Sequence, residues 1–390
     1  MKTHIYLDNS ATTPLCAPAA ERMRNLMDTY GNPSSLHSAG LEAERILSGA
    51  RREILEALGC PGASPKQLVF CGSGTEANNL ALLGSARAKD YKFKPRIIST
   101  DGEHPSVEEP LRFLEGNGFE IIRIKTEKGR IDTDSFFDAL TPETILVSIM
   151  LVNNETGALY DLPHIFSEVK KRYPDTIIHC DAVQGFLKLS FSPQSLSADL
   201  VTINAHKIGG PKGVGALYVA PEILTAKKIV PLIYGGGQEH GLRSGTENTL
   251  AIAGFGAAAK YGKENLKSHI EKTEHLRELL LEKIASDPRL AEIRIKRPEA
   301  YIPNIINITL PSIRSEIMLH FLSARGIYVS SGSACSSRSK DRSRALLAFG
   351  ATKKEADTSL RISLSPDNTE EDITIFTQAL AEGVASLIRI

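Results

Sequence analysis

A lysine in a glycine-rich turn and an aspartate at the end of an apolar run are the two residues of this chain best suited to chemistry. Lys207 lies in residues 204–211, which read NAHKIGGP. Asp181 closes residues 177–181, which read IIHCD. A lysine amine can form a Schiff base, and a buried carboxylate can keep a pyridine nitrogen protonated so that the ring accepts electrons. The pair therefore predicts a site for pyridoxal 5'-phosphate (PLP).

A phosphate cradle is predicted in residues 71–79, CGSGTEANN, where Gly74 and Thr75 open a helix directly after an apolar strand. Small residues at that position let backbone N–H groups approach an anion at the positive end of the helix. The segment lacks the Gly-Lys-Ser/Thr of a P-loop. An ordinary capped turn between a strand and a helix is the alternative explanation.

Polar residues follow two other expected strands. His104 comes after strand 96–100, so its imidazole could lie over a planar cofactor, and the alternative is a surface histidine. Asn154 belongs to residues 153–157, NNETG, which close the most apolar strand. Polar side chains are costly there unless they face a site, although a simple turn would also explain them.

Cys335 lies in a polar segment, residues 331–338, SGSACSSR, so we expect it to be exposed and nucleophilic. The basic residues that would favour its thiolate are Arg338, Lys340, Arg342 and Arg344.

Arg361 has apolar neighbours in the sequence. Its guanidinium could bind a carboxylate through two hydrogen bonds, or it could face solvent from a strand. Residues 235–246, GGGQEHGLRSGT, predict either a loop that closes on a phosphate of a neighbouring subunit or a hinge.

Composition excludes several classes of function. The chain has 390 residues, enough for two domains, with 46 basic and 46 acidic residues, so no net field favours nucleic acid or an anionic membrane. Five scattered cysteines without a C-x-x-C pair argue against a disulfide framework and against a metal site. An acid at position 8 precedes any apolar stretch, and the longest apolar run, 145–152, is too short to cross a bilayer. We expect a cytoplasmic protein.

A large α/β domain is expected over residues 15–255, because strand-like apolar runs alternate there with helix-like segments. Its sheet is predicted to have seven strands and to be mostly parallel. The expected strands are 67–71, 96–100, 120–124, 145–152, 177–181, 200–204 and 215–219. Ligands of such sheets bind at the carboxyl ends of the strands, where the candidate residues lie.

A smaller α+β domain is expected from residues 1–14 and 256–390, and it carries the Cys335 segment. Its first helix has core-facing spacing at Leu276, Leu279, Leu280 and Ile284. The expected strands are 292–296, 304–310, 327–331 and 360–365, and the expected helices are 315–325 and 369–390.

Taken in order, the motifs resemble those of the cysteine desulfurases, the NifS/IscS-like branch of the class V aminotransferase family, which are PLP-dependent enzymes of fold type I. The resemblance extends over nearly the whole chain. Its motifs are YLDNSATT at 6–13, GNPSSLH at 31–37, GSGT at 72–75, EH at 103–104, NNE at 153–155, DAVQ at 181–184, HK at 206–207, RSGT at 243–246 and SGSAC at 331–335.

The resemblance implies a role for each motif residue. Lys207 would carry the cofactor, Asp181 would pair with its pyridine nitrogen, and His104 would stack on its ring. Gln184 would donate to the phenolate oxygen of the ring. The phosphate would be held by Gly74, Thr75, Asn204 and His206, together with Thr246 of the partner subunit in a homodimer. The substrate carboxylate would be received by Asn154, which would also contact the cofactor, and by Arg361, and Cys335 would take the sulfur.

The implied reaction converts L-cysteine to L-alanine and leaves a persulfide on Cys335. The sulfur would pass to an acceptor protein, either an iron–sulfur scaffold or a tRNA sulfurtransferase. Asn204 departs from the family pattern, which has a serine or threonine there, and the cradle reads CGSGT where TSGAT is commoner. More tellingly, the segment after Cys335 reads SSRSKDRSR instead of containing Glu-Pro-Ser-His. This basic segment predicts docking of an acidic or RNA-bound sulfur acceptor. The alternatives are a selenocysteine lyase or aminotransferase of the same fold, and a catalytically silent sulfur carrier or assembly partner.

Overall fold

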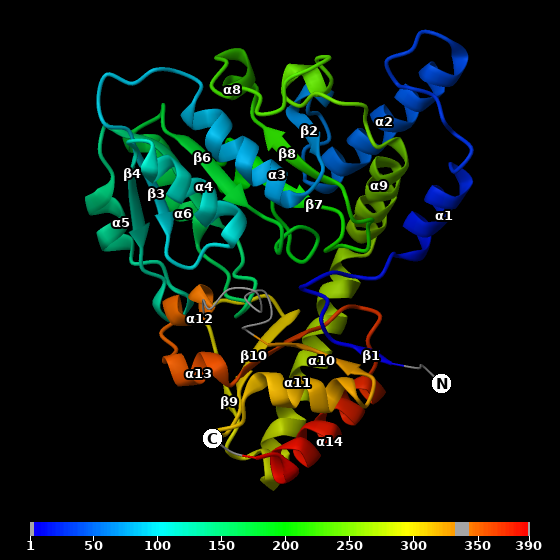
Figure 1. Cartoon of the computed structure of the whole chain (residues 1–390), viewed down its shortest axis with the longest axis vertical. Helices are drawn as coiled ribbons and strands as arrows, with labels where there is room; N and C mark the ends of the chain where they lie inside the picture. Colours follow the sequence, from blue (N-terminus) through cyan, green and yellow to red (C-terminus); the bar gives the residue numbers. More distant parts are fainter. Residues whose placement is uncertain (1–3, 332–342, 389–390) are drawn as a thin grey trace.

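A computed structural model of the chain describes residues 4–331 and 343–388. Figure 1 shows a larger part built on one sheet and a smaller part below it, joined by α9 (Thr249–Glu264) and α10 (Leu266–Ser286). Within the described residues, no helix has the length and apolar character needed to span a membrane.

The larger part is a seven-stranded sheet with the strand order β2-β8-β7-β6-β5-β3-β4. Its strands are β2 (Leu68–Cys71), β3 (Arg96–Thr100), β4 (Glu120–Ile124), β5 (Thr144–Met150), β6 (Ile177–Asp181), β7 (Leu200–Asn204) and β8 (Gly215–Val219). Only β8 runs antiparallel to its neighbours, β2 and β7. The predicted mostly parallel sheet of seven strands is therefore confirmed. Strands β6 and β7 are buried throughout, as expected for strands covered on both faces.

Helices cover this sheet. They are α3 (Gly74–Asn79), which continues into a π-helical turn at Leu80–Gly84, α4 (Pro105–Gly116), α5 (Thr133–Ala139), α6 (Leu162–Arg172), α7 (Pro193–Leu196) and α8 (Pro221–Thr225). Helix α3 packs on β2, β7 and β8, and α4 packs on β4 (Figure 1). Both helices follow strands directly, so their first residues lie at the carboxyl edge of the sheet.

A second layer of helices consists of α1 (Ala17–Asn25) and α2 (Ser38–Ala57), which both pack against α9 (Figure 1). Small side chains on α9 allow this close approach. A Cβ on Gly256 would lie 2.8 Å from Ala50 Cα, and one on Gly254 would lie 2.7 Å from Met23 Sδ. Substitution of Gly256 would therefore force the helices apart, whereas at Gly254 the flexible side chain of Met23 would have to move.

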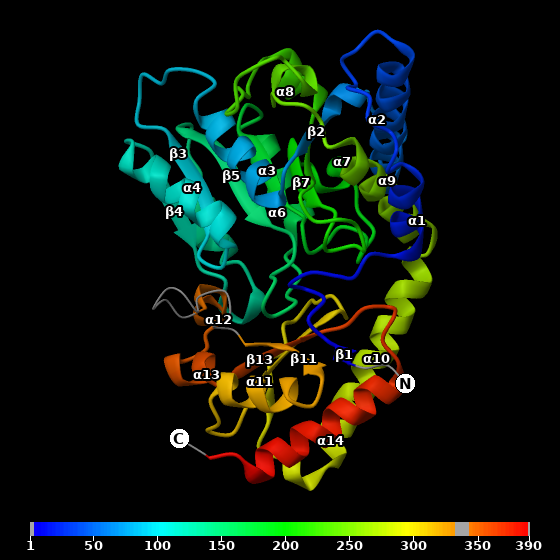
Figure 2. The same cartoon turned by 45° about the vertical axis from the view of Figure 1, so that its right-hand side comes forward.

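The smaller part is a four-stranded antiparallel sheet in the order β12-β13-β10-β9, with its own hydrophobic core (Figure 2). Its strands are β9 (Arg294–Ile295), β10 (Ile305–Thr309), β12 (Ser330–Ser331) and β13 (Ser359–Ser363), and its helices are α10, α11 (Ser315–Ser323), α12 (Arg344–Ala348), α13 (Lys353–Asp357) and α14 (Glu370–Ser386). Leu276, Leu280 and Ile284 of α10 are buried in this core, and Leu279 packs against it. The division of the chain at residues 14/15 and 255/256 stays a prediction.

The predicted strand 327–331 is wrong as a single element. The segment forms β11 (Ile327–Tyr328), which pairs in parallel with β1 (Ile5–Tyr6), and then β12, which pairs with β13. This short stretch therefore belongs to two sheets, because its first half pairs with β1 and its second half pairs with β13. The predicted helix 369–390 also begins one residue later, since Thr369 is its N-cap and accepts from Asp372 N.

A buried ion pair ties the loop after β8 to the sheet. Glu239 accepts from both terminal nitrogens of Arg51, each at 2.8 Å, and from Phe70 N at 2.8 Å. The Glu239 side chain is 2% exposed and that of Arg51 is 9% exposed. Because Phe70 belongs to β2, this contact fixes the loop that carries residues 241–246 next to the predicted phosphate cradle.

We expect Glu239→Ala to lower the free energy of unfolding by about 3–5 kcal/mol, because it leaves the guanidinium of Arg51 buried without its counter-ion. The matched control is Glu120→Ala, which breaks the more exposed pair with Arg96 and should cost about 1 kcal/mol or less. Urea unfolding of both variants measures the difference. Equal losses would contradict this account of the loop.

Candidate active site

A cavity of about 430 Å³ lies at the carboxyl edge of the large sheet, where it faces β13 of the small one. Its walls come from the turns that follow β2, β3, β5, β6 and β7, as ligand sites on such sheets do. The predicted site residues in its lining are Gly74, Thr75, His104, Asn154, Asp181, Gln184, Asn204, His206, Lys207 and Arg361.

Lys207 lies in the turn after β7 and is held by the N-terminal segment. Its Nζ donates to Ser10 O at 2.5 Å and to Ala11 O at 2.6 Å. The same segment is tied to the turn by Thr13 N, which donates to His206 O at 2.8 Å. Backbone carbonyls therefore fix the direction of the amine before any ligand is present.

Asp181 ends β6 and is 6% exposed. One of its carboxylate oxygens accepts from Asn78 Nδ2 at 2.8 Å, and the other accepts from Val183 N at 3.0 Å. Hydrogen bonds to both oxygens hold the carboxylate in one orientation, which is what a partner for a ring nitrogen requires.

His104 caps α4 and belongs to the same network. Ser106 N donates to His104 Nδ1 at 3.1 Å, and Ser106 Oγ lies 2.7 Å from the same nitrogen. Since Asn78 Nδ2 donates to Ser106 Oγ, the Ser106 hydroxyl is free to donate to Nδ1. Burial lowers the pKa of His104. The imidazole is thus neutral, with its proton on Nε2, and can stack on a planar ring.

The segment before α3 forms a narrow turn lined by backbone. Ser73 caps α3 by accepting from Glu76 N, and Glu76 accepts from Gly72 N at 2.9 Å. A Cβ on Gly215 of β8 would lie 2.8 Å from Gly74 N, so only glycine lets this strand approach the turn. Arg243 Nε donates to Glu76 at 2.9 Å and joins loop 241–246 to the turn.

Arg361 lies on β13, is 3% exposed, and already has partners from the large part. Its guanidinium donates to Asn154 O at 3.0 Å and to Asp8 Oδ1 at 3.0 Å, and Glu155 Oε1 lies 3.7 Å away. Burial raises the pKa of Glu155 to about 7, although Arg361 opposes this shift. Arg361 therefore does not face solvent from its strand. A carboxylate that entered the cavity would compete with Asp8 for its guanidinium.

Among the described residues, one predicted site residue is not brought to this cavity. Thr246 is exposed and does not line it, so the predicted role of Thr246 stays one that needs a second subunit. Cys335 lies outside the described residues, as do Arg338, Lys340 and Arg342. The fourth basic residue of that segment, Arg344, pairs with the buried carboxylate of Glu108 on α4 at 2.7 Å.

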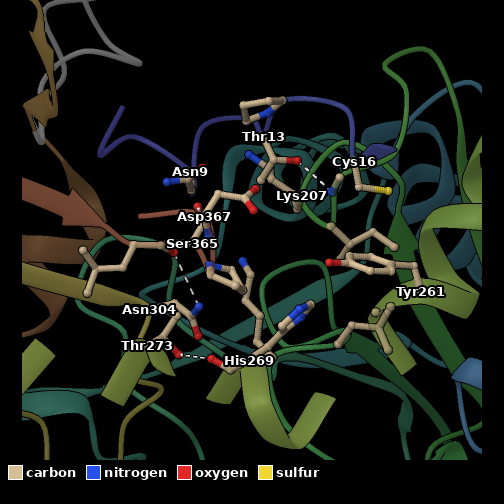
Figure 3. A pocket seen from close by; sticks show the side chains of 18 of the residues that line it. Asn9, Thr13, Cys16, Lys207, Tyr261, His269, Thr273, Asn304, Ser365 and Asp367 are labelled. Carbon is tan, nitrogen blue, oxygen red and sulfur yellow. Dashed lines mark hydrogen bonds between the residues drawn. The ribbon is translucent and has the colours of Figure 1, made fainter. Parts of the chain in front are cut away.

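A second, smaller cavity of about 90 Å³ also has Lys207 in its lining. Figure 3 shows Lys207 near Thr13 on one wall and His269 and Thr273 of α10 on the opposite wall. Thr13 Oγ1 accepts from Gly209 N at 2.8 Å. The turn that bears Lys207 therefore lies at the boundary between the large sheet and the helix that enters the small part.

Sequence reasoning missed several residues that hold the site together. Asn78 was quoted only as part of the glycine-rich motif, and nothing in the sequence marked Ser106, although both connect Asp181 to His104. Asp8 and Ser10 belong to the motif at 6–13, but their contacts with Arg361 and Lys207 join distant parts of the chain. Such contacts appear only once the fold is known.

Glu103 gives the folding stability of the protein a measurable pH dependence. This buried carboxyl accepts from Thr100 Oγ1 at 2.7 Å and from Met150 N at 3.1 Å, and burial raises its pKa to about 8. The unfolded chain releases this proton near its ordinary pKa of 4.5, while the folded chain keeps it up to about 8. Folding stability therefore falls as pH rises through this window, by at most about 1.4 kcal/mol per pH unit.

We expect Glu103→Gln, which cannot titrate, to gain stability relative to the natural chain as pH rises from about 5 to about 8. In this range the folded chain keeps the proton of Glu103 while the unfolded chain has released it. Urea unfolding at several pH values measures the difference. Glu143→Gln is the control: a hydrogen bond from Thr141 lowers the pKa of Glu143, so this variant should not gain stability with pH. A flat difference for Glu103→Gln would contradict the account.

Comparison with known proteins agrees with the motifs. The profile of the Aminotransferase class-V family matches residues 5–376. Cysteine desulfurase IscS of Dictyoglomus turgidum is 38% identical over 392 residues, which cover 100% of this chain and 96% of that protein. A solved NifS-like protein is 34% identical with a TM-score of 0.90 and covers 98% of this chain and 100% of its own. A structure of SspA in complex with cysteine is 32% identical with a TM-score of 0.78, covering 93% and 99%. These similarities confirm the predicted fold and resemblance, and the chain belongs to the class V aminotransferase family.

Proposed function

We propose that this protein is a PLP-dependent cysteine desulfurase that converts L-cysteine to L-alanine and receives the sulfur on Cys335. The observation that carries the proposal is the cavity in which Lys207, Asp181 and Arg361 meet. These residues supply an amine, a fixed carboxylate and a carboxylate-binding guanidinium. The curated relatives carry the name cysteine desulfurase, which supports this choice over a lyase or an aminotransferase.

The residues of the cavity fit PLP. Lys207 Nζ would hold its carbonyl carbon, and the buried Asp181 carboxylate would hold its ring nitrogen. Gly74 and Thr75 offer backbone N–H groups for the phosphate. The side chain of Asn204 lies beside Gly74, with Nδ2 3.3 Å from where a Cβ on that glycine would lie, so its amide N–H group could donate to the phosphate.

Bound PLP would supply an electron sink that weakens bonds next to the substrate amine. Arg361 binds the carboxylate of L-cysteine and sets the direction of its side chain. Lys207 Nζ takes the proton from the α-carbon of the substrate. The Cys335 thiolate attacks the substrate sulfur, the bond between the β-carbon and sulfur breaks, and the β-carbon takes up a proton. Lys207 Nζ then returns a proton to the α-carbon, which gives L-alanine. Neutral His104 covers the reacting face and excludes water.

The proposal extends to assembly and sulfur delivery. We propose a homodimer. Arg243 fixes the loop that contains Thr246 next to the phosphate turn, and Thr246 is exposed, so that a partner subunit could contact it there. The persulfide would pass to an acceptor protein, either an iron–sulfur scaffold or a tRNA sulfurtransferase, that recognises the basic residues after Cys335. A cytoplasmic location is part of the same proposal.

Product formation from L-cysteine in the presence of a reductant tests the proposal. The natural chain should form L-alanine and sulfide in equal amounts, and Lys207→Ala and Cys335→Ala should each lose both products. Cys60→Ala removes a buried cysteine that does not line the cavity and should stay active. Activity that survives Cys335→Ala would point to a lyase or aminotransferase instead.

Recognition of the substrate carboxylate gives a second prediction. Arg361→Lys keeps the charge but loses the planar fork, so we expect KM for L-cysteine to rise about tenfold or more. The absorbance of bound PLP should not change, which shows that the cofactor site is intact.

Asp8→Asn is the opposing variant, because Asp8 accepts from the same guanidinium. Removal of this competing charge should leave KM unchanged or lower it. An unchanged KM in Arg361→Lys, or a large rise in Asp8→Asn, would contradict the proposed role of Arg361.

A further inference from the structure

Lys188 makes a contact that the proposed reaction does not use. Its Nζ donates to Gln184 Oε1 at 2.8 Å, and Gln184 Nε2 donates to Ser10 O at 3.0 Å. Ser10 O also accepts from Lys207 Nζ. A line of hydrogen bonds therefore runs from Lys188 through Gln184 to the carbonyl that holds Lys207.

The contact decides which end of the Gln184 amide faces the cavity. In its charged form the Lys188 ammonium has three donors and no acceptor, so in that form it binds the oxygen of the amide and not its nitrogen. The Nε2 group carries two hydrogens, and Ser10 O takes one of them. The other has no acceptor among residues 4–331 and 343–388, and Gln184 lines the larger cavity. A ligand with an anionic oxygen would find a donor there.

The surroundings of Lys188 are electrostatically unfavourable for a lysine whose only role is to fill space. Burial lowers the pKa of Lys188 to about 7, and the nearby charges of Lys207 and Arg361 add to this effect. A half-buried cation beside two others is expected where function requires it. An apolar side chain of the same length would fill the space at lower cost.

We propose that Lys188 is a positioning residue that holds the amide of Gln184 with its N–H toward the ligand in the cavity. The inference rests on the proposed function, because the matching acceptor is the phenolate oxygen of PLP. With the amide reversed, its oxygen would face that phenolate and repel it. Lys188 thus acts on the cofactor through Gln184 and does not touch it.

The first test uses Lys188→Met in the holoenzyme, with PLP affinity read from the absorbance of the bound cofactor. Methionine keeps the length of the side chain but removes every donor. We expect PLP to bind about tenfold more weakly, the effect of one lost hydrogen-bond partner on a buried amide. Lys188→Arg restores a donor and should bind PLP like the natural chain. Thermal unfolding of Lys188→Met without PLP should occur at the same or a higher temperature, whereas a merely structural lysine would lower it.

Lys212→Met is the matched control. Lys212 is exposed and, like Lys188, lowers the pKa of His206, but it makes no contact with Gln184. Its replacement should leave PLP affinity unchanged. A loss equal to that of Lys188→Met would overturn the proposal, because it would assign the effect to net charge alone.

A double-mutant cycle tests whether Lys188 acts through Gln184. We expect Gln184→Leu combined with Lys188→Met to bind PLP no more weakly than Gln184→Leu alone. Additive losses would overturn the positioning role. If the natural chain and Lys188→Met bind PLP equally, only this inference fails; a natural chain that binds no PLP overturns the proposed function as well.

Discussion

Arg361 places a positive charge in a position that is only 3% exposed, and three groups from two other segments of the chain meet that charge. Asp8 comes from the N-terminal segment, while Asn154 O and Glu155 come from the loop after β5. An ion buried without such partners would cost several kcal/mol, on the order of the whole stability of a domain. The small sheet, the N-terminal segment and the large sheet must therefore meet where they do, and the cavity lies at that meeting point.

The same requirement shapes the rest of the cavity. Asp181 and His104 are joined through Asn78 and Ser106, and the amine of Lys207 is held by two carbonyls. Each of these groups is therefore held in one orientation, as a preorganised site for the proposed reaction requires. The same polar contacts also hold the fold together.

Local patterns were enough to predict most of the large sheet. The bounds of β3, β4, β6, β7 and β8 follow directly from apolar runs, and the residues at their ends could be placed at one edge by a general rule of parallel sheets. The split of 327–331 could not be predicted, because it depends on pairing with β1, which lies at the other end of the sequence. Ser106 and Asn78 were missed for a similar reason: their partners lie on other elements. The roles of Thr246 and Cys335 rest on local sequence patterns together with the family resemblance, and they stay predictions.

The transfer of sulfur to Cys335 is the central claim, and peptide mass spectrometry tests it most directly. The holoenzyme is incubated with sulfur-labelled L-cysteine without reductant and then digested. The account predicts one labelled sulfur on the peptide that contains Cys335, released by reductant and missing in Lys207→Ala. L-alanine formed without label on that peptide, or label on another cysteine, would contradict it.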